Sequence, residues 1–342
     1  MKGYSTIWAA SWVVATCSLA GITKSAEIDE RTESTSGKNY LEMRQGDTIV
    51  RLAPWAGGNA YSFSVAGVEY FRQPETLADL PGVGYGNPVL YPTPNRVKGA
   101  KFSFDGTDIV FEPNSGQNFI HGLVNRHAWQ VIEKSATVDQ AVVRMLASFE
   151  LGTGLEAKFP FPHRLYLTVT VSEQAVKWTY EVENVGNKPV PFGFALHPYL
   201  VYQGTRENTY LTIPAEGWME STQQLPSGRL VPASQLPFDL PLEQAVSMQK
   251  IKLDDVFYGM VPTKPTTIEY RGTGSVLKIT ASAQFTHLVV WTPDRPFFGV
   301  ESQTCSTDAH NLYSAGKVRE SHLQVCPPGE TMSGWVEYRV TP

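Results

Sequence analysis

Short runs of alternating apolar and polar residues recur over most of the chain, which is the pattern of β-strands with one buried face. The alternation is clearest over residues 165–171 and 176–182, which flank the polar tripeptide Ser172-Glu173-Gln174. Two such runs joined by a short polar segment predict an antiparallel hairpin with one buried and one wetter face. Further strands are predicted at residues 276–279, 288–291 and 335–340.

A second hairpin is predicted around Asp105-Gly106, which lies between alternating runs at residues 101–104 and 108–111. Asp-Gly is a strong turn signal because both central residues of a tight hairpin need positive φ. The helix candidates are short, at residues 242–251 and 74–80, and a proline begins the second of them. The 24 prolines and 28 glycines suit strands and turns. We therefore predict an all-β, antiparallel sandwich with few short helices.

The N-terminal region differs in composition from the rest of the chain. Residues 1–20 combine Lys2, an apolar run and a small-residue ending at Ala20, which predicts a secretory signal too short to span a membrane stably. A lipid anchor on Cys17 is an alternative, although the threonine before it fits poorly. Residues 21–38 are rich in Ser, Thr, Glu and Lys and are predicted to form a flexible linker. We expect a secreted or periplasmic protein whose single folded domain spans residues 39–342.

Composition narrows the possible functions. Hydrophobic residues make up 42% and aromatic residues 11% of the chain, enough for a large core. The net charge of −5 and the lack of a Lys/Arg run argue against a nucleic-acid partner. After signal cleavage, Cys305 and Cys326 remain, and they can either pair in an oxidising compartment or stay as buried thiols.

Three ionisable residues, His121, His197 and Glu301, lie among apolar or aromatic neighbours. Pro198 pushes residue 197 toward an extended or turn backbone. A carboxylate after Phe-Phe-Gly-Val is costly to bury unless it is paired or functional. Each residue alone can be an ordinary core residue, but the three together indicate a proton-transfer site. Two histidines and a carboxylate also form a known metal-ligand set, but their spacing matches no local zinc motif, so we predict no metal.

Several short motifs follow one another along residues 45–341. They are Asn95-Arg96-Val97 ahead of the Asp105-Gly106 turn, Ile120-His121-Gly122, Gly193 to Tyr199, Leu253 to Phe257, and Val300 to Cys305 running into Thr307 to Asn311. In this order the motifs resemble those of the aldose 1-epimerase (galactose mutarotase) family and its hexose-phosphate-epimerase-like relatives. The resemblance implies a galactose-mutarotase-type β-supersandwich with a sugar cleft. The chain departs from the family pattern at Ser302, where proline is frequent, and at Leu200, where an aromatic residue is frequent.

The resemblance also implies roles for individual residues. Glu301 would take the proton from the anomeric O1 hydroxyl, and His197 would protonate the ring oxygen. His121 would help to hold and polarise the sugar oxygens. The substrate-binding positions implied in the same way are Arg96, Asp254, Asn95 and Tyr199.

The implied chemistry suits these residue types. Anomer interconversion removes a proton from O1 while delivering one to the ring oxygen, and a carboxylate and an imidazole have unperturbed pKa values of about 4.3 and 6.5. We expect the site to raise the first value and to keep the imidazole protonated. Each positioned group is worth roughly 10²–10⁴ in rate, so no metal, nucleotide or redox cofactor is needed. Aromatic residues that can stack on the sugar are Trp55, Tyr61, Trp129 and Tyr199.

The sequence therefore predicts an exported aldose 1-epimerase that acts on free hexoses, with a monosaccharide as its partner and no stable membrane insertion, as a monomer or homodimer. A related possibility is epimerisation of 6-phosphorylated sugars. That reaction needs cations at the cleft rim, for which the candidates are Arg96, Lys98, Lys101 and Arg126. A third possibility is a non-catalytic carbohydrate-binding protein on the same scaffold, although a binder does not need an acid and a base across the ring.

Overall fold

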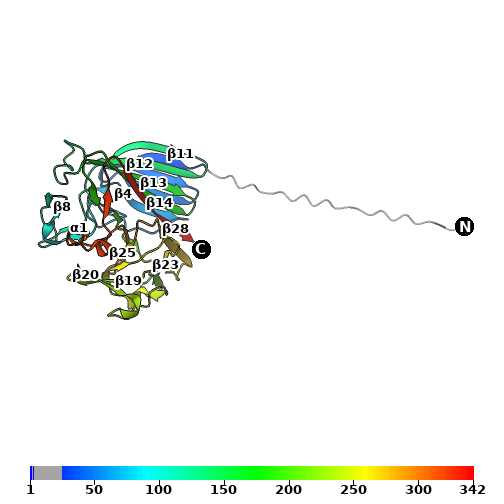
Figure 1. Cartoon of the computed structure of the whole chain (residues 1–342). Coiled ribbons are helices and arrows are strands. Elements are labelled where there is room, and N and C mark those ends of the chain that lie inside the picture. The colour runs from blue at the N-terminus through cyan, green and yellow to red at the C-terminus, as the bar shows by residue number, and fades with distance from the viewer. Residues whose placement is uncertain (2, 4–24) are drawn as a thin grey trace.

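Antiparallel β-sheets packed against one another make up the computed structural model, which describes residues 1, 3 and 25–342 (Figure 1). The predicted all-β class is confirmed. The largest sheet has nine strands in the order β11-β12-β13-β14-β28-β24-β23-β18-β21. Its strands are β11 (Gln130–Ala136), β12 (Gln140–Ser148), β13 (His163–Ser172), β14 (Ala175–Asn184), β28 (Thr331–Thr341), β24 (Ser275–Ala281), β23 (Thr266–Tyr270), β18 (Thr209–Thr212) and β21 (Val246–Ser247).

A second sheet of eight strands follows the order β20-β19-β22-β25-β26-β16-β6, with β17 also paired to β26. Its strands are β20 (Leu225–Pro232), β19 (Gly217–Thr222), β22 (Asp254–Tyr258), β25 (His287–Trp291), β26 (Phe297–Gln303), β16 (Ala195–Leu196), β6 (Val89–Leu90) and β17 (Leu200–Val201). This sheet carries the candidate site described below.

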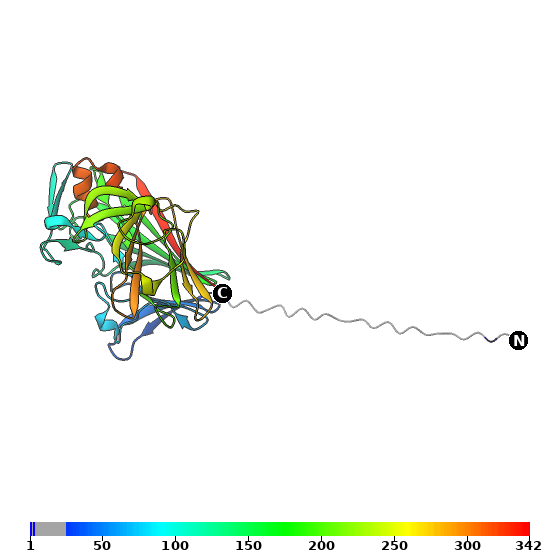
Figure 2. The same cartoon turned by 90° about the horizontal axis from the view of Figure 1, so that it is seen from below.

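The N-terminal strands form a five-stranded meander that packs on the nine-stranded sheet beside β12 and β13. In Figure 2 these blue strands lie away from the cyan hairpin and the orange helices. The strands are β1 (Glu27–Thr32), β2 (Asn39–Gln45), β3 (Thr48–Ala53), β4 (Asn59–Val65) and β5 (Val68–Glu69). The remaining strand pairs are β7 (Arg96–Val97) with β10 (Phe119–Ile120), β8 (Lys101–Phe104) with β9 (Thr107–Val110), and β15 (Val190–Phe192) with β27 (Gln324–Cys326).

The two predicted hairpins are confirmed. In the long one, Val171 lies opposite Val176, and every second side chain of β13 and β14 is buried. In the short one, Phe104 lies opposite Thr107, so Asp105 and Gly106 form the turn with φ values of 46° and 70°. The period-two burial and the Asp-Gly turn signal therefore set the register of both pairs.

The helix predictions were only partly right. The segments expected to be helical contain single 3₁₀ turns at Met248–Lys250 and Leu77–Asp79, and the second is capped by the Thr76 hydroxyl rather than begun by Pro74. Two short α-helices were missed, α1 (Ala309–Ser314) and α2 (Val318–Ser321), of which α1 contacts β8. Both have fewer than two full turns, too few to leave a clear 3.6-residue period. The other 3₁₀ turns are Lys98–Ala100 and Ala233–Gln235.

The predicted linker over residues 21–38 was wrong in its middle part. Residues 27–32 form β1, which pairs with β2 from Glu27 opposite Arg44 to Thr32 opposite Asn39. The segment looked disordered because its outward face is charged. Residues 21–24 and, apart from residues 1 and 3, the predicted signal over 1–20 with Cys17 lie outside the described residues. Within the described part, no helix is long and apolar enough to cross a membrane.

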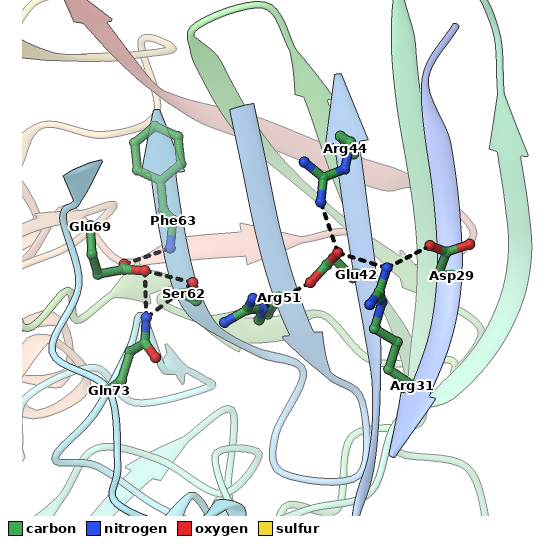
Figure 3. Close-up of polar contacts among 9 residues, drawn as sticks. All are labelled: Asp29, Arg31, Glu42, Arg44, Arg51, Ser62, Phe63, Glu69 and Gln73. Atoms are coloured by element: carbon green, nitrogen blue, oxygen red, sulfur yellow. Dashed lines mark hydrogen bonds and ion pairs between the residues drawn. The ribbon is translucent and has the colours of Figure 1, made fainter. Parts of the chain in front are cut away.

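A buried carboxylate organises the outer face of the N-terminal sheet (Figure 3). Glu42 is only 4% exposed, yet Arg31, Arg44 and Arg51 each reach its oxygens at 3.0–3.1 Å. A buried charge is tolerated when it is paired in this way. Figure 3 also shows Glu69, which accepts hydrogen bonds from the Phe63 amide and the Ser62 hydroxyl. The Arg31–Glu42 ion pair adds to the backbone pairing with β2 in holding β1 in place.

The core lies where the sheets meet. Trp178 of β14 packs against Tyr338 of β28, with ring centroids 5.0 Å apart, and Phe71 at the end of the meander contacts both rings. Tyr180, two residues along β14, stacks on Phe194, which leads into β16 of the eight-stranded sheet. One face of β14 therefore joins all three large sheets.

We expect Trp178→Ala to lower the free energy of unfolding by about 3–5 kcal/mol, because it leaves a large cavity at this junction. Trp335→Ala, on the opposite and partly exposed face of the same sheet, should cost about 1 kcal/mol or less. Urea unfolding of both variants measures the difference. Equal losses would mean that the junction is not the main core.

Candidate active site

A cleft of about 180 Å³ opens on the eight-stranded sheet, and all seven residues singled out from the sequence line it. They are Asn95, Arg96, His121, His197, Tyr199, Asp254 and Glu301. Three further lining residues were not anticipated, namely Ile120, Val289 and Trp291. The structure thus brings together side chains that are up to two hundred residues apart in the chain.

The floor of the cleft is formed by neighbouring strands β22, β25 and β26. Glu301 of β26 lies opposite Val289 of β25, and Trp291 of β25 lies opposite Asp254 of β22. Directly opposite side chains point to the same face of an antiparallel sheet. Gly299, which faces Trp291 from β26, leaves open the space beside the Glu301 carboxylate. Strand pairing therefore places the carboxylate on a rigid platform.

His197 lies in the short connection between β16 and β17. Its amide donates to the carbonyl of Pro88 at 3.0 Å, which fixes the backbone. The ring stacks on Tyr199, with centroids 4.6 Å apart and an interplanar angle of 9°, and meets Trp291 edge-on at 6.1 Å. Pro198 and the aromatic neighbours leave the imidazole little freedom to turn.

His121 enters the cleft from the β7–β10 pair. Ile120 lies opposite Arg96, and the His121 amide donates to the Asn95 carbonyl at 2.9 Å. The His121 ring meets that of His197 edge-on, with centroids 5.1 Å apart. His121 has φ of 71°, a conformation that is uncommon for residues other than glycine and that collects at functional sites. Tight packing of the following residue, Gly122, against the backbone of Tyr91 keeps His121 in this strained conformation.

The central contact is between Glu301 and His197. The carboxylate Oε1 lies 3.4 Å from the imidazole Nε2, and the residues are 3% and 5% exposed. The other carboxylate oxygen accepts a hydrogen bond from the Gln303 side-chain amide at 3.2 Å. The imidazole Nδ1 is buried and has no hydrogen-bond partner within the described chain. The pair is therefore largely removed from solvent and lines the cleft.

Burial decides where the proton of this pair resides. Loss of solvation raises the pKa of the Glu301 carboxyl to about 8, as expected from the sequence. The same loss lowers the pKa of the His197 imidazole to about 4, so the expectation of a protonated imidazole was wrong for the empty cleft. Burial also lowers the pKa of His121, with the neighbouring His197 and Arg96 adding to the effect. Near neutral pH these shifts leave the Glu301 carboxyl protonated and both imidazoles neutral.

The polar end of the cleft is held by a network around Arg96 and Asp254. The Gln224 amide donates to Asp254 Oδ2 at 2.9 Å, and Arg96 Nη1 donates to Asn95 Oδ1 at 3.1 Å. The amide of Asp308 donates to the Arg96 carbonyl at 2.8 Å. Desolvation raises the pKa of the Asp254 carboxyl, while Arg96 acts in the opposite direction. This end offers hydrogen-bond donors and acceptors but no second acid–base pair.

Other residues noted in the sequence lie elsewhere. Trp55 and Trp129 line a separate surface hollow, and Tyr61 packs in a satellite core cluster, so these aromatic residues do not border the cleft. Lys98 and Lys101 do not line it, and the guanidinium of Arg126 donates to the Pro81 carbonyl. Cys305 and Cys326 are both buried free thiols. Among the described residues, no three His, Cys, Asp or Glu side chains are grouped to hold a metal ion.

Three residues that line the cleft or support its side chains were not predicted from the sequence. Trp291 ends an ordinary apolar strand, Gln303 follows Glu301 by two positions, and Gln224 lies in a polar turn. The two-residue spacing placed Gln303 on the same face as Glu301, and that was the one available signal. The positions of Trp291 and Gln224 depend on long-range strand pairing.

Comparisons with known proteins agree on one family. Residues 50–339 match the sequence profile of the family described as aldose 1-epimerase. In Escherichia coli (strain K12), the uncharacterized protein YphB is 24% identical over 260 residues, covering 73% of this chain and 82% of that protein. The uncharacterized protein YihR is 27% identical over 175 residues, covering 49% of this chain but only 53% of that protein.

Solved structures show the same fold. A galactose mutarotase-like protein from Clostridium acetobutylicum superposes with a TM-score of 0.83 at 22% identity, covering 93% of this chain and 99% of that one. Galactose 1-epimerase from Lactobacillus acidophilus superposes with a TM-score of 0.71 at 15% identity, covering 93% and 99%. The expected galactose-mutarotase-type sandwich is thereby confirmed.

We expect Gly122→Ala to lower the free energy of unfolding by at least about 3 kcal/mol, because a Cβ at φ of 68° would collide with the Tyr91 carbonyl that supports His121. Gly116→Ala is the matched control, since its φ of 62° is similar but its Cβ would meet open space. It should cost only about 1–2 kcal/mol. Chemical denaturation of both variants measures this, and equal costs would rule out the packing argument.

Proposed function

Because the chain belongs to the aldose 1-epimerase family, we propose that it interconverts the α and β anomers of free aldose sugars by acid–base opening and reclosure of the ring. The observation that carries the proposal is the buried Glu301–His197 contact at 3.4 Å, facing a cleft of about 180 Å³. Apolar and aromatic walls with a few placed polar groups, as in this cleft, are typical of small-molecule sites.

The reaction moves two protons and leaves the enzyme's total unchanged. In the closed sugar, C1 bears the O1 hydroxyl and is bonded to the ring oxygen. Ring opening takes the proton from O1, forms the C1 carbonyl, breaks the bond between C1 and the ring oxygen, and places a proton on that oxygen. Rotation about the C1–C2 bond then presents the other carbonyl face, and the same transfers in reverse close the ring as the other anomer.

One proton shared by Glu301 and His197 satisfies this scheme. In the direction implied by the family, ionised Glu301 accepts the O1 proton and protonated His197 supplies the ring oxygen. The empty site has the other arrangement, with the proton on Glu301. Direct transfer needs the two groups to move slightly closer than 3.4 Å. Sugar hydroxyls that donate to the carboxylate favour its ionised form. Substrate binding would thus prepare the pair for ring opening.

The surrounding groups orient the sugar. His121, kept neutral by burial, can donate one hydrogen bond, and Arg96 adds a charged donor at the polar end. Asp254 can accept hydrogen bonds from sugar hydroxyls. Tyr199 and Trp291 provide aromatic walls on either side of His197. A sugar held against these walls would have O1 and the ring oxygen beside the acid–base pair.

Two alternative functions would require other features in the cleft. A 6-phosphate substrate calls for a cationic rim, yet Arg96 is the single one of the four cationic candidates that lines the cleft. Export through an N-terminal signal, which we propose, also removes the enzyme from phosphorylated sugars. A non-catalytic sugar-binding protein has no need of a buried, strongly shifted carboxyl beside an imidazole.

We expect the purified protein to speed the equilibration of freshly dissolved α-anomers, followed by polarimetry, at a rate that EDTA does not change. Glu301→Gln should lower that rate at least about a hundredfold because it removes the proton acceptor. Glu69→Gln, which alters a half-buried carboxylate outside the cleft, should keep the wild-type rate. A normal rate for Glu301→Gln would place the base elsewhere, and a loss with EDTA would favour a metal mechanism.

The rate should depend on pH as a bell with limbs near pH 4 and pH 8. Below about 4 the imidazole gains a second proton and the pair has no acceptor for the O1 proton. Above about 8 Glu301 loses its proton and the pair has none to give the ring oxygen. Values of kcat/KM, corrected for the buffer reaction, would show this. An upper limb near the unperturbed imidazole pKa of about 6.5, instead of near 8, would contradict the burial argument.

A further inference from the structure

A second, smaller hollow adjoins the polar end of the cleft. Its volume is about 10 Å³, and it shares Asn95, Arg96, Asp254 and Val289 with the cleft. His121, His197, Tyr199, Trp291 and Glu301 border only the cleft. The hollow therefore extends the cleft on the side away from the acid–base pair.

Strand register gives the direction of this extension. Glu301 lies opposite Val289, and Val289 lies opposite Val256, so these three side chains form a row across β26, β25 and β22. Val256 and Met219, from the next strand β19, pack together and line the hollow. With neighbouring strands about 4.8 Å apart, Val256 is about 10 Å from Glu301 along the sheet. A pyranose ring with its hydroxyls spans a comparable distance.

Two polar groups distinguish the hollow from a packing defect. The Thr307 residue is 1% exposed, and its hydroxyl lacks a hydrogen-bond partner within the described chain although it borders the hollow. Burying a hydroxyl unpaired is costly, which is a reason to expect a ligand partner. On the other side, Gln224 donates to Asp254 Oδ2 at 2.9 Å.

The hairpin that carries Gln224 is held in an unusual turn. Gln223 and Gln224 join β19 to β20 with φ values of 51° and 60°. Tight hairpin turns of this kind prefer Asn and Gly, and other residues pay a conformational cost. The turn nevertheless keeps the Gln224 amide on Asp254, at the border between the two hollows.

Resting on the proposed epimerase function, we propose that this hollow is a subsite, formed by Thr307 and Gln224, that recognises a hydroxyl on the C3–C4 edge of the sugar. That edge lies across the pyranose ring from the C1 and ring-oxygen atoms that react. With O1 and the ring oxygen at Glu301 and His197, the row of side chains directs the C3–C4 edge to Val256 and the hollow. The subsite thereby acts on substrate choice and not on proton transfer.

The size of the hollow limits what it accepts. About 10 Å³ is close to the space that one water molecule needs. A hydroxyl group fits, whereas a phosphate or a second sugar ring on that edge does not. The enzyme should therefore prefer hexoses that are unsubstituted at O3 and O4, and reducing disaccharides linked through O4 should be poor substrates.

The test compares glucose with 3-deoxyglucose and 4-deoxyglucose by polarimetry, in the wild type and in Thr307→Val, which keeps the shape but removes the hydroxyl. For the wild type, at least one deoxy sugar should have kcat/KM about tenfold or more below that of glucose. In Thr307→Val the value for glucose should fall to that of this deoxy sugar. The loss should be in KM more than in kcat, because Thr307 does not face the reacting atoms.

Thr93→Val is the matched control, since Thr93 is equally buried but borders neither hollow. Its hydroxyl also lacks a hydrogen-bond partner among the described residues. It should keep the wild-type preference. Gln224→Ala, at an exposed position, serves as a second variant should Thr307→Val fold poorly, and it should also reduce the discrimination. An active enzyme that treats all three sugars alike, or an unchanged preference in Thr307→Val or Gln224→Ala, would overturn the subsite alone. Inactivity of the wild type on every aldose would overturn the proposed function and the subsite with it.

Discussion

The contact between Glu301 and His197 is the constraint on which the rest of the site depends. Both side chains are removed from water, so neither charge is well solvated and the pair is most stable with a single shared proton. Such a pair is costly to hold in a core unless it is oriented and hydrogen-bonded. Gln303, Tyr199 and the backbone of Pro88 supply that support. A buried pair with shifted pKa values that lines a cleft is typical of a functional site.

The β-sheets hold Glu301 and the two imidazoles in a fixed geometry. Glu301 lies in the middle of β26, where it is paired with Val289 of β25. The two ends of β26 are held on the other side, by β16 at Gln303 and by β17 at Phe297 and Phe298. The imidazoles come from short connections fixed by tight backbone contacts, at Pro88 for His197 and at Tyr91 for the segment after His121. Sites held by regular elements and well-packed supports keep their geometry better than sites on free loops. The distance of the proposed subsite from Glu301 is likewise set by the spacing of the strands.

Much of this could be predicted from the sequence, for identifiable reasons. The hairpins at 165–182 and 101–110 follow from period-two burial and the Asp-Gly turn, and the seven cleft residues were found through family-like motifs. Strand β1 was missed because backbone pairing with β2 and the Arg31–Glu42 ion pair hold it in place, so its sequence looks like a polar linker. Trp291 and Gln224 were missed because long-range pairing brings them to the cleft. The neutral state of His197 depends on burial, which no local pattern reveals.

Before a sugar binds, we expect Glu301 to hold the proton that it shares with His197. Infrared difference spectroscopy between the wild type and Glu301→Gln measures this directly, because a protonated carboxylic acid and a carboxylate absorb at different frequencies. Because burial raises the pKa of Glu301, we expect a carboxylic-acid band from this residue at pH 6 that disappears as the pH rises through about 8. A carboxylate band from Glu301 at pH 6, with no acid band, would contradict it.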